Sequence, residues 1–554
     1  MSIKNVIILL VDALRFDCIG AEKDKRYLAR YGLEGLVNTP TIDRFAENGT
    51  LFSQAISTAP DTPPAHASLF TGLYPPRHGI RSFFHRRLPV KARTIFEILS
   101  EKGFESYCIA DKFMFRDFLA ISRGCTHNID HGDSDVKLFN LLEKSRSGKN
   151  FIFVRFLDIH YPYFITDSPV DDGHLDMSRQ ALEEVSRKFS LELPNDLGRE
   201  GGADAEAHIE NWNSLKGFLN GKECITEVLF PLYVRNINYF DGARLKSFID
   251  NLGQSGLLDD SLLVITSDHG EAKIPASKVE DGTVRFDHCY ANIDNMVRTP
   301  LILHAPGVIP EGKVIPGEVS IIDILPTILD VLEIEKDEGD GSYGIQGTSL
   351  LPLIRGEKDE GSIPYSEHGW WNDGTLGDAE KFKEMCYSGG RLLSYTPIYR
   401  QRSVRKFPFR YVEKGEELQP DDWEQPDEEF VRRLFRKVIA DWDTKHEDEV
   451  RRLTGELGAG TVTRKELFER FMGAAKAKSR CALYDLGRDP GESVNLLLLD
   501  PEGYGSRREE LKSMMDGITA VTVEEEEAVE GQGAGMDAEE IERLKQNLRN
   551  LGYL

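Results

Sequence analysis

Short apolar runs rich in valine and isoleucine recur along the chain, and three of them end at or just before an aspartate. These runs cover residues 6–11 before Asp12, 151–157 before Asp158, and 262–266 before Asp268. Largely apolar runs of this length are typical of strands that are buried on both faces of a parallel sheet. Helical stretches lie between the runs, for example at 94–99 and 243–249. The alternation of strand and helix predicts a three-layer α/β domain.

The positions of the three aspartates make them candidates for one site. In open α/β sheets, ligands bind in the crevice beyond the carboxyl ends of the strands. Asp12, Asp158 and Asp268 all follow strand ends, so we expect their carboxylates to converge. The alternative for each aspartate alone is a helix cap or the start of a turn. Because three occur together, the pattern favours a site.

The length of the chain, 554 residues, is too great for one ordinary hydrophobic core. We predict a catalytic domain over residues 1–356, with a charged, Gly- and Asn-rich insertion at about 167–222 that could act as a lid or an oligomer contact. Charged and aromatic residues dominate from 357, so a smaller domain is predicted at 357–523. A flexible acidic and Gly-rich linker is expected at 524–536, followed by a helix at 537–554.

The formal net charge of −25 and the isoelectric point near 5.1 exclude some classes of partner. A broadly negative surface repels phosphate backbones and acidic headgroups, so neither a nucleic acid nor a membrane is expected as a partner. A small anionic substrate then needs local positive charge, such as that of metal ions. The first residues contain no basic segment and no apolar run that could span a bilayer. Seven cysteines without a Cys-x-x-Cys pair favour reduced thiols and a cytoplasmic protein.

Candidate metal ligands follow the predicted strand ends. Asp268-His269-Gly270 places a carboxylate beside an imidazole, with a glycine that lets the chain turn sharply. Asp12 adds a second carboxylate, and His160 and His288 add further imidazoles. These oxygen and nitrogen donors suffice for one or two divalent ions. Ligand type alone does not choose among Zn, Mn, Mg and Ca.

A candidate nucleophile lies in the segment that begins Asp61-Thr62-Pro63-Pro64. Prolines after Thr62 fix the chain at the start of a predicted helix, where the positive helix N-terminus favours anions. A hydroxyl held there beside a metal ion loses its proton more easily and becomes a usable nucleophile. The alternative is that Thr62 is simply the N-cap of the helix.

The order of these motifs resembles the sulfatase family of the alkaline-phosphatase superfamily. The resemblance begins with residues 5–12, 39–43 and Thr62-x-Pro64, and continues through Leu157-Asp158-x-His160-x-Pro162, Ser267-Asp268-His269-Gly270-Glu271 and His288. It extends to residues 298–302, 322–327, 347–353, 483–496 and 551–554, and is weakest across the insertion and from about 359 to 480. Many ordered matches make this resemblance far more specific than any one motif.

The resemblance implies an alkaline-phosphatase-like three-layer sandwich with a mainly parallel sheet, followed by a smaller C-terminal α+β domain. It implies that a divalent metal is bound by the residues that match Asp12, Thr62, Asp268 and His269.

The resemblance also implies roles toward a small anionic ester. Lys112 matches a lysine that is aimed at the transferred group, and His160 and His288 match histidines used for substrate oxygens, leaving-group protonation or a second metal. His66 stands where an arginine is usual, and it could donate to an anion or be structural. Arg81, in the loop after the nucleophile helix, could touch substrate. A homo-oligomer is possible on this sequence.

Four departures from the family pattern affect the predicted reaction. Thr62 replaces the Cys or Ser that sulfatases convert to formylglycine, His66 replaces Arg, Ala13 replaces a second aspartate, and Met114 replaces an expected histidine. A threonine cannot become formylglycine, so we predict cleavage of a phosphate mono- or diester through a covalent Thr62 intermediate. The alternatives are a sulfuric ester hydrolase, a phosphoryl transferase or mutase, and a non-catalytic binding relative.

Overall fold

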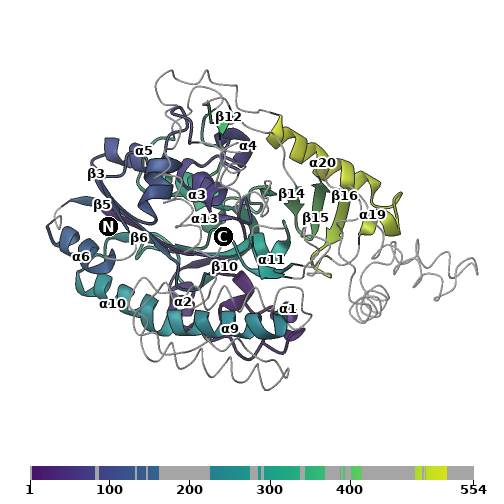
Figure 1. The fold of residues 1–554 in the computed structure, drawn as a ribbon, viewed down its shortest axis with the longest axis horizontal. Coiled ribbons are helices and arrows are strands. Elements are labelled where there is room, and N and C mark those ends of the chain that lie inside the picture. The colour runs from purple at the N-terminus through teal and green to yellow at the C-terminus, as the bar shows by residue number, and fades with distance from the viewer. Residues whose placement is uncertain are drawn as a thin grey trace, which may run out of the picture.

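An eight-stranded sheet forms the middle layer of the computed structural model (Figure 1). The structure describes residues 3–81, 87–130, 134–144, 148–160, 225–274, 285–288, 292–336, 343–368, 387–388, 391–392, 401–414, 481–488, 492 and 495–520. The strand order is β10-β2-β9-β6-β1-β5-β3-β4. Neighbouring strands are parallel except where β9 pairs with β2 and β6. The predicted α/β fold with a mainly parallel sheet is therefore confirmed.

The strands of this sheet are short and largely buried. They are β1 (Asn5–Val11), β2 (Thr50–Ile56), β3 (Phe104–Ile109), β4 (His127–Ile129), β5 (Lys149–Phe156), β6 (Ser261–Thr266), β9 (Arg298–His304) and β10 (Lys313–Ser320). β1, β5 and β6 fall where the three apolar runs predict strands. All seven residues of β1 are buried, which agrees with a strand covered on both faces.

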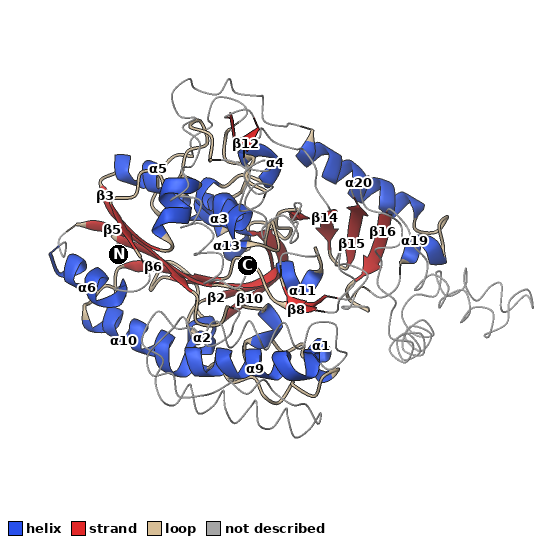
Figure 2. Ribbon diagram, viewed as in Figure 1, coloured by secondary structure: helices blue, strands red, loops and turns tan. Residues whose placement is uncertain are grey.

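Helices cover both faces of the sheet (Figure 2). One face carries α3 (Thr62–Thr71), α4 (Pro75–His78), α5 (Ile95–Glu101), α12 (Ile324–Val331) and α13 (Leu351–Arg355). The other carries α1 (Arg26–Ala29), α2 (Pro40–Glu47), α6 (Ser134–Lys144), α9 (Ile225–Phe240) and α10 (Lys246–Gln254). Alternate strand side chains enter the two cores, so that Phe151 and Phe153 face α3 whereas Ile152 and Val154 face α9.

A separate antiparallel sheet has the order β11-β14-β15-β16. Its strands are β11 (Tyr365–His368), β14 (Gln401–Lys406), β15 (Phe409–Lys414) and β16 (Cys481–Asp485), and it packs with α19 (Leu496–Leu499) and α20 (Gly505–Thr519). Its core contains Tyr365, Tyr411 and Leu511 together with Tyr74 from the larger domain. The expected smaller α+β unit is confirmed, whereas the domain boundaries stay predictions.

The remaining described elements are small. They are α11 (Asp294–Val297), the strand pair β7 (Ala272–Ile274) and β8 (Arg285–Asp287), the strand pair β12 (Tyr387–Ser388) and β13 (Arg391–Leu392), the short 3-10 helices at Phe16–Cys18 and Ile321–Asp323, and the π-helical turns at Phe113–Phe118 and Asp241–Leu245. The predicted insertion at about 167–222, the linker at 524–536 and the helix at 537–554 lie outside the described residues. Among the described residues, no helix is long and apolar enough to cross a membrane.

Candidate active site

The loops after β1 and β6 bring two of the predicted aspartates together. The backbone N–H of Ala13 donates to Asp268 Oδ1 at 3.2 Å, and that of Leu14 donates to Ser267 Oγ at 2.9 Å. Ala13 has a φ of 61°, an uncommon value for a residue with a Cβ, and this turns its N–H toward Asp268. Tyr233 of α9 holds the same loop, since its hydroxyl donates to the Ala13 carbonyl at 2.5 Å.

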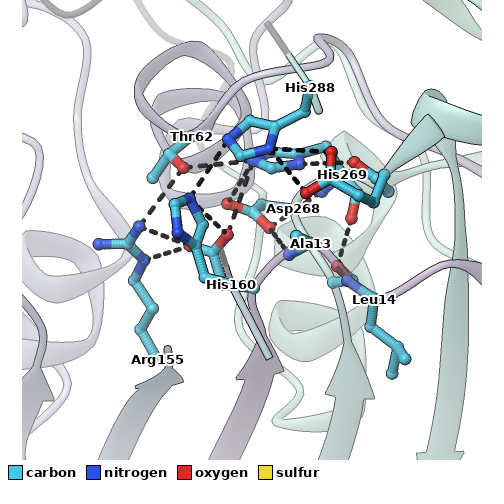
Figure 3. Close-up of polar contacts among 12 residues, drawn as sticks. Ala13, Leu14, Thr62, Arg155, His160, Asp268, His269 and His288 are labelled. Atoms are coloured by element: carbon cyan, nitrogen blue, oxygen red, sulfur yellow. Dashed lines mark hydrogen bonds and ion pairs between the residues drawn. The ribbon is translucent and has the colours of Figure 1, made fainter. Parts of the chain in front are cut away.

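Thr62 is the first residue of α3, and its hydroxyl lies beside these carboxylates. Asp61 is the N-cap, in an extended conformation, so the alternative that Thr62 itself is the cap is wrong. Pro63 and Pro64 follow in the first turn, where a missing N–H costs no helical hydrogen bond. Thr62 Oγ1 lies 3.3 Å from His269 Nε2, and both side chains are buried (Figure 3). The helix N-terminus thus points its partial positive charge at the site.

His269 is oriented as a metal ligand. Its Nδ1 lies 3.0 Å from the Gly270 carbonyl, an acceptor, so Nδ1 carries the proton and Nε2 keeps its lone pair. Nε2 lies 3.7 Å from Asp12 Oδ1 and 3.6 Å from Asp268 Oδ2. Gly270 permits this arrangement by close approach rather than by a positive φ, because a Cβ there would lie 2.3 Å from the Asn295 carbonyl oxygen.

The donor set fits a divalent cation. Ligand atoms of Asp12, Asp268 and His269 all lie within 4.8 Å of one another. Asp12 Oδ1 and Asp268 Oδ2 are buried without a hydrogen-bond partner, although an unpaired buried carboxylate oxygen is costly. One cation could be coordinated by these two carboxylate oxygens, one imidazole nitrogen and the Thr62 hydroxyl. It would give both buried oxygens the partner that they lack. The residues predicted to bind metal are therefore brought together.

The two carboxylates differ in their electrostatic surroundings. Burial raises the pKa of Asp12, but the charges of Arg155 and nearby histidines outweigh it and hold the pKa far below its usual range. Burial and the neighbouring Asp12 charge raise the pKa of Asp268 to about 6. At neutral pH both carboxylates are thus available to a cation.

Arg155, which was not among the predicted site residues, lies beside Thr62, the candidate nucleophile. Its Nε and Nη2 donate to Asp12 Oδ2 at 2.6 and 2.5 Å, and Nη2 lies 3.4 Å from Thr62 Oγ1 (Figure 3). Its side chain is completely buried at the carboxyl end of β5. The available signal was a single charged residue in the run 151–157, which we interpreted only as a buried strand.

His160 and His288 face each other across the site. Their Nε2 atoms are 3.2 Å apart, and His160 Nε2 lies 3.9 Å from Asp12 Oδ1. Nδ1 of His288 lies 3.2 Å from Glu271 Oε2, so the carboxylate fixes the imidazole with Nε2 toward His160. The ring of His288 also stacks on that of His269, with 4.3 Å between centroids. The two predicted histidines therefore share the space next to Thr62.

Glu271 and Asp287 are two further buried carboxylates of this region that sequence reasoning missed. Together with His288 they form a second group whose ligand atoms lie within 4.8 Å of one another. Glu271 directly follows the Asp-His-Gly motif and Asp287 directly precedes His288, so proximity in sequence was the available signal.

His66 lies inside α3 among aromatic rings rather than in solvent. Its Nδ1 lies 2.8 Å from the Thr62 carbonyl and 3.5 Å from Asp268 Oδ2, and Phe115 packs edge-on against its ring at 4.8 Å. Burial and the nearby Arg155 charge lower the pKa of His66 to about 3, so the ring is neutral at physiological pH. A role for His66 toward substrate stays a prediction.

Three other candidates lie at the edges of this arrangement. Lys112 follows β3, which lies two strands from β1, and the Lys112 backbone N–H donates to Asp130. Within the described part of the chain, no contact of Thr62 involves the Lys112 side chain. Arg81 is buried and its Nε lies 2.5 Å from Glu367 Oε1 of β11. Asp158 lies 3.8 Å from Arg244 rather than beside Asp12.

Relatives of this chain were found by sequence and by structure. An arylsulfatase from Clostridium perfringens is 21% identical over 407 residues, which cover 63% of this chain and 78% of that protein. A solved structure in complex with its substrate D-glucosamine-2-N,6-O-disulfate has a TM-score of 0.57 at 15% identity, and the match covers 94% of this chain and 98% of that one. Phosphonate monoester hydrolase of Agrobacterium radiobacter has a TM-score of 0.51 at 17% identity, covering 93% and 95%.

These structural likenesses, at low identity, establish the fold. A family model described as sulfatase matches residues 4–334, which contain every strand of the large sheet and all of the site residues described above except Glu367. Because this match covers more than half of the sequence, the chain belongs to the sulfatase family.

Proposed function

We propose that this sulfatase-family hydrolase cleaves a phosphate mono- or diester by transferring the phosphoryl group to Thr62. The observation that carries the proposal is the position of the Thr62 hydroxyl, 3.3 Å from His269 Nε2 and 3.4 Å from Arg155 Nη2 at the start of α3. A buried hydroxyl beside a carboxylate-imidazole donor set and a guanidinium is suited to in-line attack on an anionic ester.

A divalent cation would be held by Asp12, Asp268, His269 and the Thr62 hydroxyl. When bound, it supplies Lewis-acid polarisation and positive charge next to the nucleophile. Asp268 and Asp12 contribute one orphaned oxygen each, and the His269 Nδ1 contact with Gly270 keeps Nε2 directed at the same point.

The residues around Thr62 can divide the reaction into two displacements. Thr62 Oγ1 loses its proton to water and forms a bond to phosphorus while the ester bond to the leaving alcohol breaks. A proton from His160 or His288 passes to the leaving oxygen, because the Nε2 atoms of these imidazoles face each other at 3.2 Å in the space beside Thr62 (Figure 3). Water then attacks phosphorus, the bond to Thr62 breaks, and its oxygen regains a proton.

Two arguments support phosphate over sulfate. Oxidation of a serine or cysteine side chain can give an aldehyde, whereas Thr62 carries a methyl group on Cβ and cannot. A sulfate ester of Thr62 would therefore need hydrolysis by water, without the elimination route that an aldehyde hydrate provides. Local charge also favours the dianion of a phosphate monoester over the monoanion of a sulfate ester, because Ala13 leaves the site one carboxylate short and Arg155 adds a positive charge.

A sulfuric ester hydrolase is the second candidate. It is supported by the names of the relatives, among them the Clostridium perfringens arylsulfatase. A phosphoryl transferase or mutase would use the same first step, with a second alcohol in place of water.

The test is hydrolysis of an aryl phosphate monoester, an aryl phosphodiester and an aryl sulfate by metal-stripped protein that is refilled in turn with Zn, Mn, Mg or Ca. We expect a phosphate ester to be preferred, and Thr62→Ala to lower turnover by roughly 1,000-fold or more while it still binds the metal. Dominant cleavage of the sulfate would contradict the proposed substrate class. If none of the three esters is hydrolysed with any of the metals, the result would favour a non-catalytic relative.

A further inference from the structure

Arg155 occupies a position on β5 where an apolar side chain would be expected. It pairs in register with Leu10 of β1, and the residues before it on the same face, Phe151 and Phe153, belong to the core beneath α3. Its guanidinium carbon lies 5.6 Å from the Phe115 ring centre. A permanent charge in such a place is costly unless it is paired, so its presence needs a reason beyond packing.

A purely structural ion pair is a weak reason. Replacing a buried ion pair by apolar side chains is often neutral or stabilising, so the pair with Asp12 does not by itself account for Arg155. The geometry adds a second contact, because the Nη2 that binds Asp12 Oδ2 at 2.5 Å also lies 3.4 Å from Thr62 Oγ1. The guanidinium thus joins a metal-ligand carboxylate to the attacking hydroxyl.

Arg155 leaves the other oxygen of Asp12 available to a cation. Its Nε and Nη2 both contact Asp12 Oδ2, whereas Asp12 Oδ1 faces His269 Nε2 at 3.7 Å and His160 Nε2 at 3.9 Å. The guanidinium and the cation site therefore lie on opposite sides of one carboxylate, with Thr62 Oγ1 next to both. A tetrahedral anion attached to Thr62 would meet positive charge from two directions.

The helix position that could otherwise contact the transferred group is occupied by His66, one turn after Thr62. Its Nδ1 is engaged with the Thr62 carbonyl at 2.8 Å. Within the described residues, Arg155 is the side chain with a permanent positive charge that contacts Thr62.

We propose that Arg155 is a catalytic residue whose guanidinium binds oxygens of the group transferred to Thr62, opposite the cation held by Asp12, Asp268 and His269. This inference rests on the proposed function for the identity of the transferred group, but not for its negative charge. No proton leaves the guanidinium. The Thr62 oxygen loses its proton to water and bonds to phosphorus, the bond from phosphorus to the leaving oxygen breaks, and that oxygen takes a proton from His160 or His288. Arg155 donates hydrogen bonds throughout. Planar donors of this kind suit phosphoryl oxygens.

Arg155→Met is the principal variant, and Arg298→Met is its matched control. Arg298 is also a mostly buried arginine of the large sheet, with its Nη2 2.8 Å from Glu22 Oε2 and its guanidinium carbon 4.5 Å from the Phe16 ring centre. It has no contact with Thr62 in the described structure. Binding of inorganic phosphate, binding of Mn²⁺ and turnover of an aryl phosphate are measured for both variants, the first by calorimetry with and without metal.

The affinities for phosphate and for the metal should respond differently to the Arg155→Met substitution. In Arg155→Met, phosphate binding should weaken about 10- to 100-fold with or without metal, because a charge-assisted hydrogen bond is lost. The metal affinity should stay the same or increase, because the Arg155 guanidinium no longer competes with the metal for Asp12. The value of kcat should fall roughly 100- to 1,000-fold. Arg298→Met should keep the wild-type phosphate affinity. Unchanged phosphate binding in Arg155→Met, or equal losses of phosphate and metal binding, would overturn the proposal.

Two further variants keep the test open if Arg155→Met does not fold. Arg155→Lys retains the charge without the planar fork and should show an intermediate loss of phosphate affinity, whereas Arg155→Gln retains a donor without the charge and should resemble the full loss. Wild-type phosphate affinity in Arg155→Gln would overturn the role. Sulfate is titrated in parallel: if aryl sulfate proves to be the substrate and Arg155→Gln loses sulfate affinity, the role of Arg155 stands and the proposed phosphate ester does not.

Discussion

Asp12 and Asp268 lie beside the same histidine, yet their carboxyl groups have different proton affinities. Arg155 donates twice to Asp12, whereas Asp268 receives the backbone N–H groups of Ala13 and His269 at 3.2 and 2.9 Å and lies near the Asp12 charge. Burial and that charge raise the pKa of Asp268 to about 6. A single arginine therefore decides which of two similar aspartates keeps a proton in mildly acidic solution.

Metal binding should therefore depend on pH through Asp268. Below a pH of about 6 the metal-free protein carries a proton on Asp268 that a cation must displace, so the metal association constant should fall about tenfold per pH unit there. Calorimetric titrations with Mn²⁺ between pH 5 and 8 measure this slope. Asp268→Asn keeps His269, so its shallower slope and lower affinity isolate the aspartate. Equal slopes in the two proteins would contradict this assignment.

At the scale of elements, α3 is fixed at its C-terminus and in its middle. Its C-terminus passes into Gly72, with a φ of 67°, and a Cβ there would lie 2.7 Å from Ile345 Cγ2. His78, the last residue of α4, holds the middle of α3, since its Nε2 lies 2.9 Å from Ser68 Oγ while its Nδ1 accepts the Ile80 N–H at 3.1 Å. Burial and the nearby Arg81 charge lower the pKa of His78 to about 3.

Acid should weaken the fold through this neutral histidine. An unfolded histidine binds a proton below a pH of about 6.5, whereas native His78 binds one only near 3, so the free energy of unfolding falls with decreasing pH between these values. The expected contribution is about 1.4 kcal/mol per pH unit. Urea denaturation of the metal-free protein at pH 7, 6 and 5 should show a correspondingly shallower decline for His78→Gln. An identical decline would mean that His78 is protonated in the native state.

The elements that sequence could predict are those whose signal is local. Apolar runs gave the positions of β1, β5 and β6, and the Thr94–Glu97 capping box marks the start of α5. The antiparallel β9 was not predicted, because pairing direction depends on distant strands. The same limit explains the site: Asp12, Thr62, Asp268 and His269 follow from motifs, whereas the contacts of Arg155 with Asp12 and Thr62 depend on strand register.

At the scale of the whole molecule, the smaller sheet holds the chain that leads into Thr62. The Glu367 N–H of β11 donates to the Thr58 carbonyl at 2.9 Å, and the Ser366 hydroxyl donates to the Ser57 carbonyl. Glu367 also pairs with Arg81, and Tyr365 donates to Glu367 at 2.6 Å. Residues about 300 positions apart thus meet beside the chain that leads into Thr62, the proposed nucleophile, and no local pattern reveals this contact. This contact makes the second domain part of the support for the site.

The negative net charge of the molecule makes the few positive groups near Thr62 more important for binding an anion. A formal charge of −25 repels anionic esters at long range, so attraction has to arise at the site itself. The start of α3 and Arg155 supply positive charge next to the Thr62 hydroxyl, and the divalent cation proposed for this site would add more. The proposed reaction is accordingly covalent: an anionic group is transferred to this threonine.

The most direct measurement is acid quenching during turnover of an aryl phosphate labelled with ³²P, followed by peptide mapping by mass spectrometry. The account predicts one labelled peptide, spanning the start of α3, with the phosphoryl group on Thr62 and no label in Thr62→Ala. Turnover without any labelled protein species, or label on another residue that survives in Thr62→Ala, would contradict it.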